Sequence, residues 1–225
     1  MKVFVYSVFT VLLFAFSACI EIIDDLSINE DGSGTFKYTV NLSSSKVKVN
    51  SILALDSLDG KKVPSLTEIE QKLKDLEASL KEQEGISKVA FSADYDNFIF
   101  KLKCDFSSLA VLQNAVKELA IKENKGNEIP ELQKEWLTFE KDTLIRSVPK
   151  ITLIKTNKIN KRDAELLKEG NYTSITRFSN EIVSYNNAKA KLSKSKKAIM
   201  IRANPYLLTQ NPQLLDNIIS LKDSE

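Results

Sequence analysis

The residue types in this sequence that could carry chemistry are a few clustered acids. Three neighbouring pairs stand out: Asp24 with Asp25, Glu30 with Asp31, and Asp94 with Asp96. Paired carboxylates can hydrolyse glycosidic bonds, but two of these pairs fall at predicted turns, where aspartate suits the backbone. The sequence contains no histidine, which excludes serine–histidine–aspartate and cysteine–histidine nucleophiles and histidine metal sites. We therefore expect no catalytic residue, no metal site and no cofactor, and we expect that the protein is not an enzyme.

Cys19 occupies the position of a lipid attachment site. Residues 1–18 have a positive start, an apolar stretch and small residues before the cysteine, which is the layout of a secretory signal peptide. The apolar stretch is shorter than the roughly 20 residues that cross a bilayer. The segment FSAC, which ends at Cys19, resembles a lipobox with Phe16 where leucine is usual. That resemblance implies cleavage before Cys19, a thioether diacylglycerol, and an acyl chain such as palmitate on the new amine. The alternative is an ordinary secretory peptide, or a buried strand, with a chance cysteine.

The length of the chain allows one large domain or two small ones. Removal of residues 1–18 from the 225-residue chain leaves 207 residues, because 225 minus 18 is 207. We expect a single domain over 19–225, with a core in 20–121 and further strands and short helices in 133–221. The net charge of +2 argues against nucleic-acid binding. If Cys19 carries the lipid, Cys104 has no disulfide partner. Cys104 lies in an apolar alternation, so we expect a buried, unreactive thiol.

Alternating apolar and polar side chains predict two strands at the start of the mature chain, over residues 20–28 and 35–42. The segment 29–34 between them contains Asp-Gly, a strong hairpin signal because glycine accepts positive φ. The same segment mimics the first half of a calcium loop. Val40 stands where that loop needs a glutamate, so we expect no calcium.

The middle of the chain is predicted to hold two helices around a second hairpin. In order, we expect a long connection over 43–64, a helix over 65–84, a hairpin over 89–106, and a helix that ends near residue 121. Ser65 and Glu68 form a capping-box pattern at the start of the first helix. Its narrow apolar stripe suits packing on a sheet, with a coiled coil as the alternative.

The carboxyl-terminal part is predicted to hold shorter elements. In order, we expect a hairpin over 136–149 that turns near 141–142, a surface helix over 158–170, a strand over 172–182, a hairpin over 189–202, two helical turns at 204–208 and 211–215, and a short strand or frayed tail over 217–225. The whole order predicts the α+β class, with a curved antiparallel sheet built from hairpins and two main helices packed on it.

Four features carry a resemblance to a known family: Cys19 leading directly into a strand, the turn at 29–34, the helix–hairpin–helix block 65–121, and the segment 176–201. Together they resemble the LppM-like lipoprotein domain and its Bacteroidota relatives of unknown function. The resemblance implies a membrane-tethered domain whose curved sheet and helix enclose an apolar cavity, with lipid handling as the proposed role. The LppM type also has a carboxyl-terminal transmembrane segment, which we do not find in this sequence.

Aromatic and aliphatic side chains on the predicted strands are the candidate lining of such a cavity. They are Phe36, Tyr38, Val40, Phe91, Phe98, Phe100 and Leu102. As a cavity lining they would suit an apolar ligand, and as a plain core they need none. The sequence leaves both alternatives open.

A basic run in the hairpin over 189–202 is a candidate contact for anionic lipid headgroups. Its central residues are Lys194, Lys196 and Lys197. Lysines near an anionic membrane surface are attracted to it. The alternative is a solvated hairpin tip that discourages pairing between sheet edges.

From these patterns we expect a lipid-anchored cell-envelope lipoprotein, most simply in the outer membrane, in its periplasmic leaflet or on the cell surface. The expected function is a non-catalytic binding module for a lipid or another apolar ligand. The alternative is an adaptor that docks on other envelope proteins. The expected partners are the membrane, a lipid ligand or envelope proteins, and no nucleic acid. The predicted strand starts directly after Cys19, so the domain should lie against the bilayer with the 29–34 turn pointing away.

Overall fold

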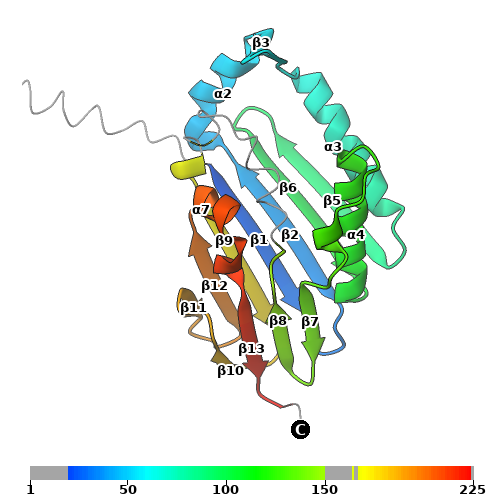
Figure 1. Ribbon diagram of the computed structural model, residues 1–225, viewed down its shortest axis with the longest axis vertical. Helices are drawn as coiled ribbons and strands as arrows, with labels where there is room; N and C mark the ends of the chain where they lie inside the picture. The colour runs from blue at the N-terminus through cyan, green and yellow to red at the C-terminus, as the bar shows by residue number, and fades with distance from the viewer. Residues whose placement is uncertain (1–19, 150–163, 165–166, 224–225) are drawn as a thin grey trace, which may run out of the picture.

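A seven-stranded sheet lies behind the helices in Figure 1 and forms the frame of the molecule. The computed structural model describes residues 20–149, 164 and 167–223. In the order of pairing, the strands are β11 (Ala190–Leu192), β12 (Ala198–Ala203), β9 (Asn171–Phe178), β1 (Glu21–Ile28), β2 (Gly34–Asn41), β6 (Ile99–Phe106) and β5 (Ile86–Asp94). With the helices described below, this confirms the predicted α+β class.

Strand β1 is the centre of this sheet. All eight of its residues pair with β2 in the antiparallel sense and with β9 in the parallel sense. The β1–β9 pair departs from the predicted antiparallel sheet, while the other pairs in this sheet are antiparallel. A parallel neighbour requires a long connection, and more than a hundred residues separate β1 from β9.

A second sheet of four strands packs on the inner face of the first, in front of it in Figure 1. Its strands pair in the order β10 (Ile182–Tyr185), β13 (Asn217–Leu221), β8 (Thr143–Arg146) and β7 (Leu137–Glu140). Leu144 and Ile219 of this sheet join Leu26 and Ile28 of β1 in one apolar core. The prediction of one sheet was therefore incomplete. The carboxyl-terminal segment, expected as a short strand or frayed tail, is paired on both sides in this sheet.

Two helices cover the rest of the inner face, near β5 and β6, as predicted. Helix α3 (Leu66–Lys81) begins with the full capping box of Ser65 and Glu68, and it packs on β5. Helix α4 (Leu109–Glu123) begins at Ser108, whose side chain accepts a hydrogen bond from the backbone of Val111. Both starts follow the rule that a side-chain oxygen satisfies an unpaired N–H of the first turn. Among the described residues, no helix is long and apolar enough to span a bilayer.

The predicted hairpin turns are confirmed. In the β1–β2 turn Gly32 has φ +78°, and the backbone N–H of Asn29 donates to the carbonyl of Ser33 over 2.8 Å. In the β7–β8 turn Lys141 and Asp142 both have positive φ, which is the geometry that matches the twist of a tight hairpin. The predicted helical turns near the carboxyl end are α7 (Pro205–Gln210) and the 3-10 helix η3 (Pro212–Leu215).

Three expectations about element bounds were wrong or lie outside the described residues. The connection predicted over 43–64 contains the 3-10 helix η1 (Ser43–Ser45), helix α2 (Lys46–Leu53) and a ribbon of β3 (Ser57–Leu58) and β4 (Lys61–Lys62). The single strand predicted over 172–182 is two strands in different sheets, because β9 ends at Phe178 and β10 begins at Ile182. Most of the helix predicted over 158–170 lies outside the described residues. The 3-10 helix η2 (Pro130–Leu132) lies between α4 and β7.

Candidate functional site

A buried carboxylate lies on the inner face of β1. Asp24 has the same orientation as Leu26 and Ile28, which belong to the core, and only 5% of its surface is exposed. In the sheet it lies between Tyr38 of β2 and Ser174 of β9. Removing a charge from water is costly unless it is paired and hydrogen-bonded, so the neighbours of Asp24 must supply these interactions.

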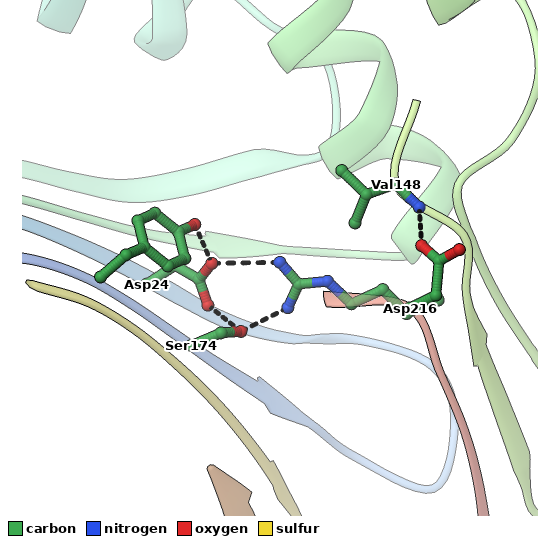
Figure 2. Close-up of polar contacts among 6 residues, drawn as sticks. Asp24, Val148, Ser174 and Asp216 are labelled. Atoms are coloured by element: carbon green, nitrogen blue, oxygen red, sulfur yellow. Dashed lines mark hydrogen bonds and ion pairs between the residues drawn. The ribbon is translucent and has the colours of Figure 1, made fainter. Parts of the chain in front are cut away.

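Three side chains from two sheets supply them, as Figure 2 shows. Arg146 of β8 donates from Nη2 to Oδ2 of Asp24 over 3.1 Å, and the Tyr172 hydroxyl donates to the same oxygen. Ser174 donates to Oδ1 over 2.6 Å. Arg146 also donates from Nη1 to the Ser174 oxygen over 2.5 Å, which closes a ring between the sheets. We call Asp24, Arg146, Tyr172 and Ser174 the polar cluster.

The electrostatics of the polar cluster fix its protonation. Burial raises the pKa of Tyr172 well above its usual value, and the negative charge of Asp24 raises it further. Tyr38, beside the cluster, has a raised pKa for the same two reasons. Burial alone would lower the pKa of Arg146, but Asp24 and Tyr172 outweigh that effect, so its pKa is raised. At neutral pH Arg146 is therefore a cation, and the hydroxyls of Tyr172 and of the neighbouring Tyr38 are protonated.

Three residues of the polar cluster, Asp24, Arg146 and Tyr172, line a pocket between the two sheets and α4. The cavity has a volume of about 180 Å³. Its apolar lining consists of Leu26, Phe36, Leu112, Val116, Trp136 and Leu137. Its polar lining consists of Asp24, Tyr38, Gln113, Arg146 and Tyr172. The pocket is thus apolar along its walls, with hydrogen-bonding groups among its lining, which is the usual composition of small-molecule sites.

Gln113 of α4 holds the wall that carries Trp136. Its side-chain oxygen accepts from the backbone N–H groups of Trp136, over 2.7 Å, and Leu137, over 2.9 Å. Its side-chain nitrogen donates to the carbonyl of Leu137 over 2.9 Å and to that of Leu109 over 3.2 Å. A buried amide with all these bonds made fixes the start of β7 against α4. The indole of Trp136 is therefore presented on a rigid part of the lining.

A second polar contact anchors the end of β8, next to Arg146. The backbone N–H of Val148 donates to Oδ1 of Asp216 over 2.7 Å (Figure 2). Asp216 directly precedes β13, so this bond ties together two neighbouring strands of the second sheet.

The predicted cavity residues divide into two groups. Phe36 and Tyr38 line the pocket, with their ring centroids 6.3 Å apart. The other five do not line this pocket: Val40, Phe91, Phe98, Phe100 and Leu102. Phe98 is buried at the β5–β6 turn with φ +54°, and Phe100 contacts the ring of Tyr95 edge-on. Leu102 packs against the main core.

Four residues of the site are not marked by local sequence patterns as site residues: Asp24 as a buried group, Arg146, Tyr172 and Trp136. The sequence does indicate that Asp24 is buried. In the first strand it alternates with Ile22, Leu26 and Ile28, so its side chain points to the same apolar face. A carboxylate on the apolar face of a strand needs a buried partner that forms hydrogen bonds or an ion pair with it. The partner itself could not be read from the sequence, since Arg146 lies 122 residues away.

The predicted headgroup lysines lie at the far end of the sheet from the start of β1. Lys194, Lys196 and Lys197 belong to the β11–β12 turn, and β12 begins beside Arg177 at the end of β9. The β1–β2 turn lies at that same end, because Ile28 pairs with Phe178. An eight-residue strand is roughly 26 Å long. We therefore do not assign these lysines to a membrane that holds Cys19, which itself lies outside the described residues.

Three of the clustered acids that could have carried chemistry have structural roles instead. Asp31 and Asp94 accept backbone hydrogen bonds inside their turns, from Ser33 and Asn97. Asp25 forms an ion pair with Arg177 over 2.8 Å on the outer face of the sheet. Within the described ranges, no group of acids and cysteines has the arrangement of a metal site. Cys104 is buried, as predicted, and burial raises the pKa of its thiol to about 11.

Comparisons with known proteins give a likeness in structure but none in sequence. No protein-family model matches the chain, and no curated protein matches it. Among solved structures, the folded domain of LppM from Mycobacterium tuberculosis, determined by NMR, is similar with a TM-score of 0.40 and 14% sequence identity. The likeness covers 91% of each chain. We base no functional assignment on it, and membership of the LppM-like family stays a prediction.

Proposed function

We propose that this protein is a lipid-anchored envelope lipoprotein whose domain binds an apolar ligand, or one end of a lipid, without catalysis. The observation that carries the proposal is the pocket between the two sheets, with its apolar walls and with Asp24, Arg146 and Tyr172 of the polar cluster in its lining. The lipobox-like segment that ends at Cys19 supports the anchor. In pockets of this composition, the apolar walls hold the apolar part of the ligand, and the hydrogen-bonding groups orient its polar part.

The size of the pocket limits what it can hold. Its volume of about 180 Å³ is below the roughly 300–1,000 Å³ that is usual for drug-sized ligands. We therefore propose that the ligand is short, or that only one end of a longer chain enters.

The polar lining of the pocket favours a ligand with an uncharged hydrogen-bond acceptor. Arg146 and Tyr38 carry N–H and O–H donors in this lining, whereas the Tyr172 hydroxyl already donates to Asp24. The pKa of each tyrosine is raised, so both hydroxyls stay protonated. Asp24 already balances the charge of Arg146. A free anion would compete with Asp24, whereas an ester carbonyl or a hydroxyl would not. A monoacylglycerol has both the required acyl chain and such a neutral head.

Trp136 gives a direct test, because it is the only tryptophan in the chain and it lines the pocket. Titration of the mature protein with a bromine-labelled monoacylglycerol should quench its fluorescence with a saturating curve. Val116→Phe places a larger side chain at the rim of the pocket. We expect it to weaken the apparent affinity about tenfold or more, which corresponds to at least ~1.4 kcal/mol.

The matched control is Val183→Phe, an exposed valine of β10 that does not line the pocket. This variant should give the same fluorescence-quenching curve as the wild type. Absence of quenching in the wild type, or equal quenching curves for the two phenylalanine variants, would show that the pocket does not take this ligand class.

A further inference from the structure

One part of the fold has no core of its own. It consists of α2, the β3–β4 ribbon and the start of α3, over residues 46–66, and we call it the arch. It extends beyond one end of the seven-stranded sheet, at the top of Figure 1. Between residues 46 and 79 no side chain is fully buried. A folded segment that buries so little apolar surface in water is expected to have a second surface against which it packs.

The arch rises from the same end of the sheet as the start of β1. Glu21 pairs with Asn41, the last residue of β2, and α2 begins five residues after Asn41. Cys19 precedes Glu21 by two residues, which span at most about 7 Å. Because β1 is paired on both sides over its whole length, it cannot lengthen this tether without breaking the sheet. Any acyl anchor on Cys19 would therefore bring the bilayer to the arch.

The surface of the arch has the chemistry of a membrane interface. Val47 is 77% exposed, Leu55 is 46% exposed and Leu66 is 43% exposed. Between residues 46 and 63 the chain has four lysines and two aspartates, a net charge of +2. One of these lysines, Lys62, also pairs with Glu68 over 2.6 Å. Exposed aliphatic side chains next to lysines favour binding at the boundary between anionic headgroups and acyl chains.

We propose that the arch inserts its exposed aliphatic side chains into the interfacial layer of the anionic bilayer that holds the Cys19 anchor. The proposal rests on the anchor of the proposed function but not on a ligand in the pocket. The anchor and the arch together make two contacts with the same membrane, so they fix the orientation of the domain. The end of the sheet near Glu21 faces the lipid, and the β1–β2 and β11–β12 turns point away from it.

Fluorescent labels at single positions test this contact. Cysteines are introduced by Val47→Cys or Leu55→Cys, and each lipidated protein is labelled with an environment-sensitive nitrobenzoxadiazole dye. The native cysteines should not react, because Cys104 is buried with a raised pKa and the Cys19 sulfur would be a thioether. The labelled proteins are placed in vesicles of phosphatidylethanolamine and phosphatidylglycerol that contain a nitroxide-labelled lipid. We expect nitroxide quenching of at least half of the dye emission at both positions.

The control is Val183→Cys, because this exposed residue follows Ile182, which is hydrogen-bonded to the far β11–β12 turn. A dye there should show little quenching. Vesicle-bound protein with equally low quenching at positions 47, 55 and 183 would overturn the proposal and favour a protein partner or a second copy on the arch. Equal, strong quenching at all three would overturn the proposed orientation. Protein that does not float with the vesicles at all would instead refute the anchor.

Discussion

Asp24→Ala should lower the free energy of unfolding by about 3–5 kcal/mol, the range found when one partner of a buried ion pair is removed. The substitution leaves the guanidinium of Arg146 between the two sheets without its counter-charge, and only 14% of that side chain is exposed. It also removes the acceptor of the Tyr172 and Ser174 hydroxyls. Urea denaturation followed by circular dichroism measures the effect, and the thermal midpoint should fall by roughly 6–20 °C for a domain of this size.

The neighbouring residue gives a matched control. Asp25 pairs with Arg177 on the outer face, where 48% of the arginine side chain is exposed. Water screens such a pair, so Asp25→Ala should cost about 1 kcal/mol or less. A loss at Asp24 no larger than the loss at Asp25 would contradict the role of the polar cluster. The double variant Asp24→Leu with Arg146→Met should recover much of the stability, because an apolar pair of similar volume can replace a buried ion pair.

Cys19→Ala should release the protein from membranes almost completely. The acyl chains expected on Cys19 supply most of the binding, since each buried methylene contributes about 0.8 kcal/mol and two or three chains are involved. The arch alone offers a few aliphatic side chains and a small positive charge, and salt weakens the latter. Fractionation of cells in high salt, with incorporation of labelled palmitate as a second readout, measures the effect.

Cys104→Ala is the control for that experiment, because it removes a cysteine that is buried in the fold. The Cys104→Ala protein should still incorporate labelled palmitate and should still fractionate with membranes. Palmitate in the Cys19→Ala protein, or its retention in membranes at high salt, would show that Cys19 is not the attachment site.

Local patterns were enough to predict much of the fold. The alternation of residues 20–28 and 35–42, with Asp-Gly between them, predicted the β1–β2 hairpin because side-chain period and turn chemistry act over a few residues. The Ser65–Glu68 capping box marked the start of α3 for the same reason. The parallel pairing of β1 with β9 was not accessible, because pairing between distant strands leaves no mark in either segment alone.

The candidate site was predicted only in part. Phe36 and Tyr38 were recognised because they lie on the apolar face of a clear strand, and both line the pocket. Arg146 looked like an ordinary polar residue at the end of a hairpin, and its role depends on packing of the second sheet against the first. Helix α2 was missed because its segment has no strong apolar stripe and contains β-branched Val47 and Val49, which disfavour helices.

The central claim is that the pocket holds an apolar ligand in the cell, and native mass spectrometry of the lipidated protein tests it most directly. Wild-type protein and Val116→Phe are extracted from their own membranes in a mild detergent and compared under identical conditions. The account predicts that the wild type carries an additional non-covalent mass of lipid size, which gentle activation removes and which is depleted in Val116→Phe. Wild-type protein without any such mass, or the same mass at equal occupancy on both proteins, would contradict the claim.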